Sequence, residues 1–251
     1  MILEAALLAA YAFHMEDAVA LCARAVEGWH RSWLTALGLR SESDVEAWRA
    51  VDDPPYIYFR AITLRPDTPA AAVTVAAGAV CDSWQTLDLR PHGYRVWRKE
   101  PWFLRPAAPA AGDVPAELEV VRVTTPAEVE ELEAVSVRGF GTEDSTIDPG
   151  TFHPPAVLED PRMVLWLGRV AGKAVGAAMS YRTDEAVGIF GVTTIASARR
   201  RGYGGALTEA AMLADTGLPA ILAPSEEGES LYRKLGFEQV GELSIWNLKQ
   251  P

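Results

Sequence analysis

Apolar residues recur at helical spacing near the start of the chain. Val19, Cys22, Val26, Trp33 and Leu37 lie three, four or seven positions apart, which predicts an amphipathic helix with a buried apolar stripe. Cys22 is therefore expected to be a core residue.

The rest of this Trp-rich first part alternates between helix-like and strand-like patterns. A second short helix is predicted to begin near Ser43. Residues 55–64, PYIYFRAITL, are predicted to form a strand because they are rich in aromatic and β-branched residues. An Ala-rich run after Pro69 is helix-like, and residues 87–106 alternate like one or two strands.

A proline-rich segment without apolar periodicity follows at residues 105–117, RPAAPAAGDVPAE. Such a composition is typical of a linker between two compact units. We therefore predict an accessory or repeat-like domain over residues 1–108, a linker over 109–117 and a second domain over 118–251.

The second part begins with a helix-start signal. Thr125 supplies an N-capping hydroxyl, Pro126 follows at the first helical position, and Glu128 lies three residues after the cap. The helix is expected to end near Gly139.

Strands and helices then alternate to the end of the chain. Residues 163–170 and 174–181 are apolar and flank a short Gly-containing turn, which predicts a hairpin, and residues 186–195 predict a third strand that is buried on both faces. The remaining expected elements are a helix over 202–217 with Leu207, Ala210, Ala211 and Ala214 on one face, a strand over 219–225, a helix over 225–236 and a closing strand pair over 237–248.

Composition and charge exclude several classes of protein. With 49% hydrophobic residues the chain has enough apolar material for a core, so disorder is excluded. The longest uncharged stretch, residues 68–81, is too short to span a membrane. No membrane is therefore an expected partner, and a formal net charge of -11 would repel a polyanion, so nucleic acid is not an expected partner either. The same charge would favour a cationic substrate, although acidic surfaces more often serve solubility.

The cysteines and the start of the chain bear on location. Cys22 and Cys81 allow at most one disulfide and form no zinc-ligand spacing, so no metal is expected. The opening residues, MILEAALL, have no basic lead segment and no cleavage pattern, so no signal peptide is predicted. A cytoplasmic location is the resulting expectation.

The strongest chemical signal lies in residues 192–207, VTTIASARRRGYGGAL. A buried strand gives way to three arginines, then to three glycines in four residues, and then to an amphipathic helix. Glycines let a ligand approach the backbone, and the first N–H groups of a helix have no intrahelical acceptor. Such a helix start suits a pyrophosphate. The alternative is a solvated basic turn.

Two other phosphate motifs do not fit. A P-loop needs Ser or Thr after its Gly-Lys pair, but the Gly-Lys pair at residues 172–173 is followed by Ala174. A dinucleotide fingerprint, G-x-G-x-x-G, needs its last glycine at position 207, where residues 202–207, GYGGAL, have Leu207, and no acidic residue follows at the expected strand end. Nucleotide hydrolysis and NAD binding are therefore disfavoured.

What remains, Arg199-x-x-Gly202-x-Gly204, resembles the coenzyme A pyrophosphate motif of the GNAT superfamily of N-acetyltransferases. Residues 225–237, with Ser225, Gly228, Leu231-Tyr232 and Gly236-Phe237, resemble the second family motif, N-x-x-A-x-x-L-Y-x-x-x-G-F. The resemblance covers residues 118–251. Ser225 stands where the family commonly has Asn, and the strand before the loop lacks the Glu that some members use as a base.

The resemblance implies an α+β fold, a mixed sheet flanked by helices, with a GNAT-like acyltransferase domain in residues 118–251. It implies a transferase that moves acetyl from acetyl-CoA to a primary amine of a small molecule or peptide by direct attack in a ternary complex. Tyr232 would protonate the departing thiolate, while no general base is named. A homodimer is left open, and a catalytically inactive, CoA-binding regulatory module is the alternative function. The implied acetyl-CoA contacts are Val192, Thr194, Arg199, Arg200, Arg201, Gly202, Tyr203, Gly204, Gly205 and Ser225.

Acidic residues near the two motifs have two interpretations. The segment containing Glu143, Asp144, Asp148 and His153 lies in the region that commonly lines the acceptor pocket in the resembling family. These residues could bind a cationic amine, although solvated carboxylates and a structural histidine are the commoner roles. Residues 226–227, two glutamates, are expected to cap the helix that contains Tyr232.

A short internal similarity suggests the origin of the first part. Residues 87–96 resemble residues 231–240 in their glycine-aromatic step and the valine that follows. We expect residues 1–108 to be a smaller, degenerate GNAT-like α/β half that helps to wall the acceptor site. An unrelated helical accessory domain is the alternative.

Overall fold

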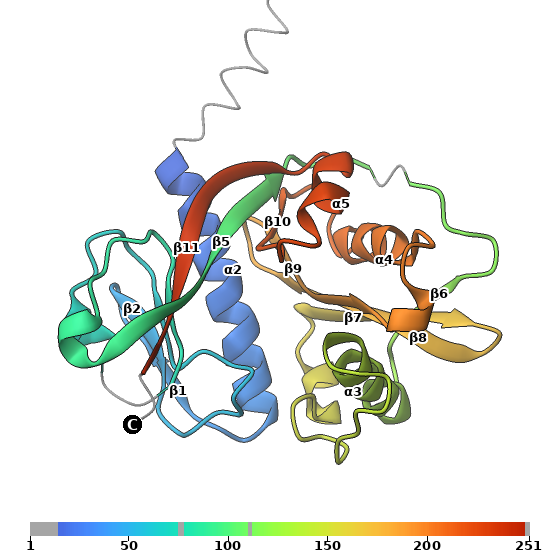
Figure 1. Cartoon of the computed structure of the whole chain (residues 1–251), viewed down its shortest axis with the longest axis horizontal. Coiled ribbons are helices and arrows are strands. Elements are labelled where there is room, and N and C mark those ends of the chain that lie inside the picture. Colours follow the sequence, from blue (N-terminus) through green and yellow to red (C-terminus); the bar gives the residue numbers. More distant parts are fainter. Residues whose placement is uncertain (1–14, 75–77, 110–111, 249–251) are drawn as a thin grey trace, which may run out of the picture.

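Two series of short strands share a single mixed sheet with helices on both faces (Figure 1). The computed structural model describes residues 15–74, 78–109 and 112–248. The sheet has eleven strands in the order β1-β2-β3-β4-β11-β5-β10-β9-β8-β7-β6. The helices are α2 (Met15–Ala36), α3 (Pro126–Phe140), α4 (Tyr203–Met212) and α5 (Glu229–Lys234). The strands are β1 (Ser41–Ser43), β2 (Ala47–Ala50), β3 (Ala61–Thr63), β4 (Val80–Asp82), β5 (Tyr94–Arg105), β6 (Glu119–Arg122), β7 (Met163–Val170), β8 (Lys173–Arg182), β9 (Val187–Thr194), β10 (Ala220–Leu222) and β11 (Glu238–Leu248).

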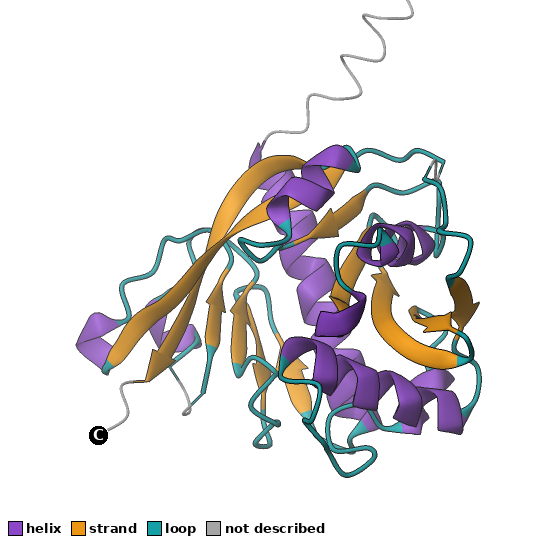
Figure 2. Ribbon diagram, turned by 45° about the vertical axis from the view of Figure 1, so that its right-hand side comes forward, coloured by secondary structure: helices purple, strands orange, loops and turns teal. Residues whose placement is uncertain are grey.

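The strands form two series along the chain, β1 to β5 and β6 to β11, which share a pairing order. Each series pairs with the last strand of the other. In each series two antiparallel pairings, β1-β2-β3 and β7-β8-β9, are followed by one parallel pairing, β3-β4 or β9-β10. Strand β4 then pairs with β11, and β10 pairs with β5. The long strands β5 and β11 pair with each other and lie side by side (Figure 2). An internal repeat would produce this order, and the degenerate repeat in residues 1–108 stays a prediction.

The division into domains remains a prediction. Described residues between Arg105 and Glu119 form no helix or strand. Strand β5, which precedes the predicted linker, nevertheless lies between two strands that follow it. The two parts of the chain are therefore joined through the middle of the sheet.

The first helix is confirmed as α2. The predicted stripe of Val19, Cys22, Val26 and Trp33 is buried in the main core, and Leu37 packs against it from just beyond the helix end. The thiols of Cys22 and Cys81 are free, and burial raises the pKa of each.

Three predictions in the first part are corrected. The helix expected near Ser43 is wrong, because Asp44 accepts hydrogen bonds from the backbone N–H groups of Glu46 and Ala47 and turns the chain from β1 into β2. The strand expected over residues 55–64 is limited to Ala61–Thr63. The Ala-rich run forms a 3-10 turn at Ala70–Ala72, and residues 75–77 lie outside the described part, as does the opening MILEAALL.

The end of the chain also differs from expectation. The closing strand pair is wrong, since β11 is one strand whose partner is β5. Gly241 marks a register shift rather than a turn, and a Cβ there would lie 2.5 Å from Val19. The glutamates at 226–227 do not cap α5, which begins at Glu229 after Gly228 without a side-chain cap. Helix α4 ends at Met212, before Ala214.

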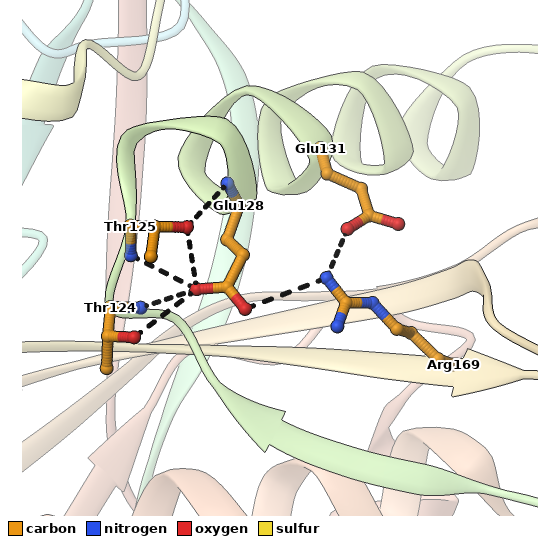
Figure 3. Close-up of polar contacts among 5 residues, drawn as sticks. All are labelled: Thr124, Thr125, Glu128, Glu131 and Arg169. Atoms are coloured by element: carbon orange, nitrogen blue, oxygen red, sulfur yellow. Dashed lines mark hydrogen bonds and ion pairs between the residues drawn. The ribbon is translucent and has the colours of Figure 1, made fainter.

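The helix-start signal at Thr125 is confirmed (Figure 3). The Thr125 hydroxyl accepts from the Glu128 backbone N–H, and the Glu128 carboxylate accepts from the backbone N–H groups of Thr124 and Thr125. These bonds hold the pKa of Glu128 below its usual value. Arg169 on β7 lies 3.8 Å from the same carboxylate and also pairs with Glu131, which ties α3 to the sheet.

Thr125→Ala is expected to lower the free energy of unfolding by about 1 kcal/mol, because one orphan N–H of the helix start loses its acceptor. Urea unfolding followed by circular dichroism measures this change. Thr124→Ala is the comparison variant, since it keeps the backbone N–H that bonds to Glu128 and loses only the 3.4 Å bond from its hydroxyl to the same carboxylate. Equal losses in the two variants would contradict the assigned role of the Thr125 hydroxyl.

Two histidines are buried as neutral side chains. Burial lowers the pKa of His30 to about 4 and that of His153 to about 3. The His30 Nδ1 lies 2.8 Å from the Val26 carbonyl oxygen, and His153 packs against Trp33 with ring centroids 4.6 Å apart. An unfolded histidine titrates near pH 6.5, so protonation below that pH stabilises the unfolded chain.

The stability contributed by neutral His30 and His153 should be complete above pH 6.5 and should fall as the pH drops toward 4. The slope is at most about 1.4 kcal/mol per pH unit for each histidine. Urea unfolding at pH 7 and pH 5 should show a smaller difference for His153→Gln than for the unaltered chain. The exposed His92→Gln is the control, and an unchanged difference in His153→Gln would refute this account.

Candidate functional site

Strand β9 separates from β10 partway along its length. The two strands pair only at Val187 and Gly188. A bulge follows in β9, where the register with β8 shifts and Gly191 adopts a φ of +59°. Bulges bend a strand and end its pairing on one side. The edge of β9 that faces β10 therefore has no partner strand beyond Gly188 among the described residues.

A cleft of about 1460 Å³ opens at this separation. Its walls come from β9, from the start of α4, from the turn before α5 and from α5 itself. Helix α2 and strands β5 and β11 line the opposite side. The cleft thus draws its walls from both strand series.

The Gly-rich loop presents unpaired backbone donors to this cleft. Gly202 is the N-cap of α4, with a φ of +83°, and its carbonyl accepts the helix's first bond from the Ala206 N–H at 3.1 Å. The N–H groups of Tyr203, Gly204 and Gly205 have no acceptor within the part of the chain that the structure describes. Gly204 and Gly205 are half-buried and line the cleft. The amides are available to an anion.

The three arginines of the loop differ in their surroundings. Arg199 donates to the Gly139 carbonyl at 2.9 Å and to the Thr194 carbonyl at 3.3 Å, which fastens the loop to α3 and to the end of β9. Arg200 is exposed at the cleft with a φ of +61°. Arg201 is exposed but is not among the residues that line the cleft.

Two neighbouring side chains support the loop. The Tyr203 side chain is buried and donates through its hydroxyl to Glu117 at 2.9 Å. Only the backbone of Tyr203 is therefore available to a ligand in the cleft. The Glu143 carboxylate accepts from the Ser197 N–H, and this bond lowers the pKa of Glu143. Glu143 therefore fixes the loop in place and is not free to bind an amine substrate.

Tyr232 and Ser225 approach the cleft from the side of α5. Tyr232 is 9% exposed, lines the cleft and packs edge-on against Phe237. Burial raises its pKa to about 12, although a hydrogen bond with the Thr208 side chain acts in the opposite direction. Ser225 is exposed at the cleft, and its carbonyl accepts the N–H of Gly228.

The acidic segment before β7 is not part of the cleft. His153 is buried, and Asp144 and Asp148 are exposed outside the cleft lining. Glu133, which was not among the predicted site residues, is a fully buried carboxylate that accepts the N–H groups of residues 150, 152 and 153. A glutamate among the apolar positions of a helix is a signal that could have indicated it.

The bulged strand β9, which diverges from its parallel neighbour β10, and the uncapped Gly-rich start of α4 lie within one stretch of the chain that matches a known family. Residues 129–237 match the model of the acetyltransferase (GNAT) family. The chain therefore contains a GNAT-family N-acetyltransferase domain. Among the described residues no helix is long and apolar enough to cross a membrane, and no cluster of three or more potential metal ligands occurs.

Solved structures share this fold over most of the chain. A GCN5-related N-acetyltransferase from Kribbella flavida aligns with a TM-score of 0.63 at 20% identity, over 90% of this chain and 96% of its own. A putative GNAT-family acetyltransferase from Novosphingobium aromaticivorans aligns with a TM-score of 0.58 at 19% identity, over 89% and 97%. A GCN5-related N-acetyltransferase-like protein from Streptococcus suis aligns with a TM-score of 0.51 at 18% identity, over 94% and 100%. No curated protein matches the sequence.

Proposed function

We propose that the chain transfers an acetyl group from acetyl-CoA to a primary amine by direct attack in a ternary complex. The observation that carries this proposal is the set of unpaired N–H groups at residues 203–205, which meet the cleft beside the unpaired edge of β9. Acetyl-CoA supplies an activated thioester when it is bound.

The residues around the loop suit that ligand. The amides of Tyr203, Gly204 and Gly205 would hold the pyrophosphate, since hydrogen bonds to a charged oxygen contribute about 1.5–3 kcal/mol each. Arg200, which lines the same cleft, would add positive charge near the pyrophosphate. Arg199 keeps the loop in place through Gly139. The exposed Ser225 would replace only part of the hydrogen bonding of an amide side chain.

The reaction needs a group that stabilises negative charge and a group that supplies a proton. Backbone N–H groups at Val192 and Thr194, along the free edge of β9, would donate hydrogen bonds to the pantetheine arm of acetyl-CoA and to the developing oxyanion. Tyr232 stays protonated at neutral pH because its pKa is about 12, so it can donate to the departing sulfur. The acceptor would enter from the α2 side.

Titration calorimetry with acetyl-CoA and thiol release with a panel of amines test this function together. We expect binding and an amine-dependent release of free thiol. Binding without thiol release for any amine would instead indicate a CoA-binding regulatory module. Absence of binding would refute the proposed site.

A further inference from the structure

Aromatic side chains line the α2 side of the cleft. Trp29 on α2 stacks on Phe190 of β9, with ring centroids 5.0 Å apart and planes 29° apart. His30 stacks on Phe59 at 4.9 Å. All four side chains line the cleft, and Trp29 and Phe190 are half-buried. This wall offers a flat apolar surface to a ligand.

A carboxylate lies on the same face of the sheet. Glu100 of β5 is directly paired with Leu243, and Trp102 is directly paired with Gly241. Directly paired residues share a face of the sheet, as do alternate residues of one strand. A Cβ at Gly241 would lie 2.5 Å from Val19 of α2, so this is the face that α2 covers.

Phe190 of β9 lies on that face as well, since it stacks on Trp29 of α2. A gap in the sheet, where β10 has ended, separates it from Glu100 of β5. Strand β10 separates β9 from β5 only as far as Leu222, which pairs with Phe103. Glu100 lies beyond Phe103 along β5, and Phe190 lies beyond the last pairing of β9 with β10 at Gly188. Both residues line the cleft that fills the space where β10 has ended.

Glu100 has spare capacity to accept hydrogen bonds. Its side chain is only 13% exposed, and its Oε1 pairs with the Arg98 Nη2 at 2.7 Å. No second partner is found among the described residues. A carboxylate can accept about four hydrogen bonds, and a buried one is unfavourable unless it is paired. Desolvation accordingly raises the pKa of Glu100. The other carboxylate oxygen, Oε2, has no partner among the described residues and is available to a cation.

We propose that this part of the cleft is the acceptor site and that it selects primary amines with a flat aromatic body, the arylalkylamines. The amine binds as its ammonium ion paired with Glu100, and it gives one proton to that carboxylate, which passes it to solvent, before the neutral nitrogen attacks the thioester. The ring packs against the Trp29 and Phe190 pair. The inference rests on the proposed function, because it names the substrate class of that same cleft. A small amine without a ring would lose the aromatic contact.

Titration calorimetry with three matched ligands tests the site without catalysis. The ligands are 2-phenylethylamine, 2-phenylethanol, which lacks the charge, and ethylamine, which lacks the ring. We expect 2-phenylethylamine to bind at least about 10-fold more tightly than either of the others. Equal affinity for ethylamine, or for 2-phenylethanol, would overturn the proposal even without a variant.

Variants then assign the two contacts. Glu100→Gln should weaken 2-phenylethylamine by about 10-fold to 100-fold and leave 2-phenylethanol unchanged, because only the charge-assisted bond is lost. Trp29→Leu should weaken both ring compounds and leave ethylamine unchanged. Glu238→Gln, at an exposed position of β11, is the matched control. Unaltered affinity in Glu100→Gln would overturn the assignment.

Acetyl-CoA titration of the same samples separates this inference from the proposed function. Glu100-dependent binding of 2-phenylethylamine without acetyl-CoA binding would support the acceptor site and refute acetyl transfer. Acetyl transfer to ethylamine as fast as to 2-phenylethylamine would support the transferase and overturn the arylalkylamine class. Acetyl-CoA affinity should be the same in Glu100→Gln and in the unaltered chain.

Discussion

Gly204→Val is expected to abolish acetyl-CoA binding. Gly204 lies in the first turn of α4, where the backbone must come close to the pyrophosphate, and valine would place two methyl groups in that approach. A Cβ at this position meets the Leu231 side chain at 3.5 Å, an ordinary contact. The structure thus assigns the effect to blocked access rather than to backbone strain. Titration calorimetry should detect no heat of binding.

The control for this experiment is Gly217→Val, since Gly217 is outside the cleft and does not have a positive φ. Both variants should unfold at nearly the same temperature as the unaltered chain. Unaltered affinity in a folded Gly204→Val protein would show that the N–H groups of residues 203–205 do not hold the cofactor.

Tyr232→Phe should lower turnover by about 10²-fold to 10⁴-fold while acetyl-CoA affinity stays unchanged, the usual scale for loss of a general acid. The variant keeps the ring that packs against Phe237, so the fold should be retained. Thiol release at saturating acetyl-CoA and amine measures turnover, and calorimetry measures the affinity. Tyr56→Phe, at an 85% exposed position, is the control.

A Tyr232→Phe enzyme with full turnover would leave the tyrosine with a packing role alone. A parallel loss of affinity and turnover would indicate that the hydroxyl holds the cofactor. Only a loss confined to turnover supports proton donation.

The sequence predicted the elements of the second part well because their signals are local. The cap of α3 depends on residues 125 and 128, and the β7–β8 hairpin depends on a turn in which Ala171 and Gly172 have φ values of +49° and +74°. The Gly-rich helix start is likewise encoded within a few positions. Such features require no knowledge of distant contacts.

The first part was harder to predict because its strands are short and pair over long distances. Strand β3 has three residues, and its pairing with β4 is parallel, so no tight turn marks it. The exchange of β5 and β11 could not be predicted from the sequence, since either strand could supply the backbone hydrogen bonds that the edges of β4 and β10 need. The alternation around Glu100 predicts a strand, but the face that α2 covers follows only from the register with β11.

The exchange of β5 and β11 has a consequence for how the protein is made. Residues 118–251 without β5 would leave β10 and β11 without the strand that lies between them, and residues 1–108 would lack the partner of β4. Unpaired sheet edges promote aggregation. During synthesis, β5 can pair with β10 before β11 is made, but that edge of β4 stays open until β11 follows, so the sheet is completed only when both parts of the chain are present.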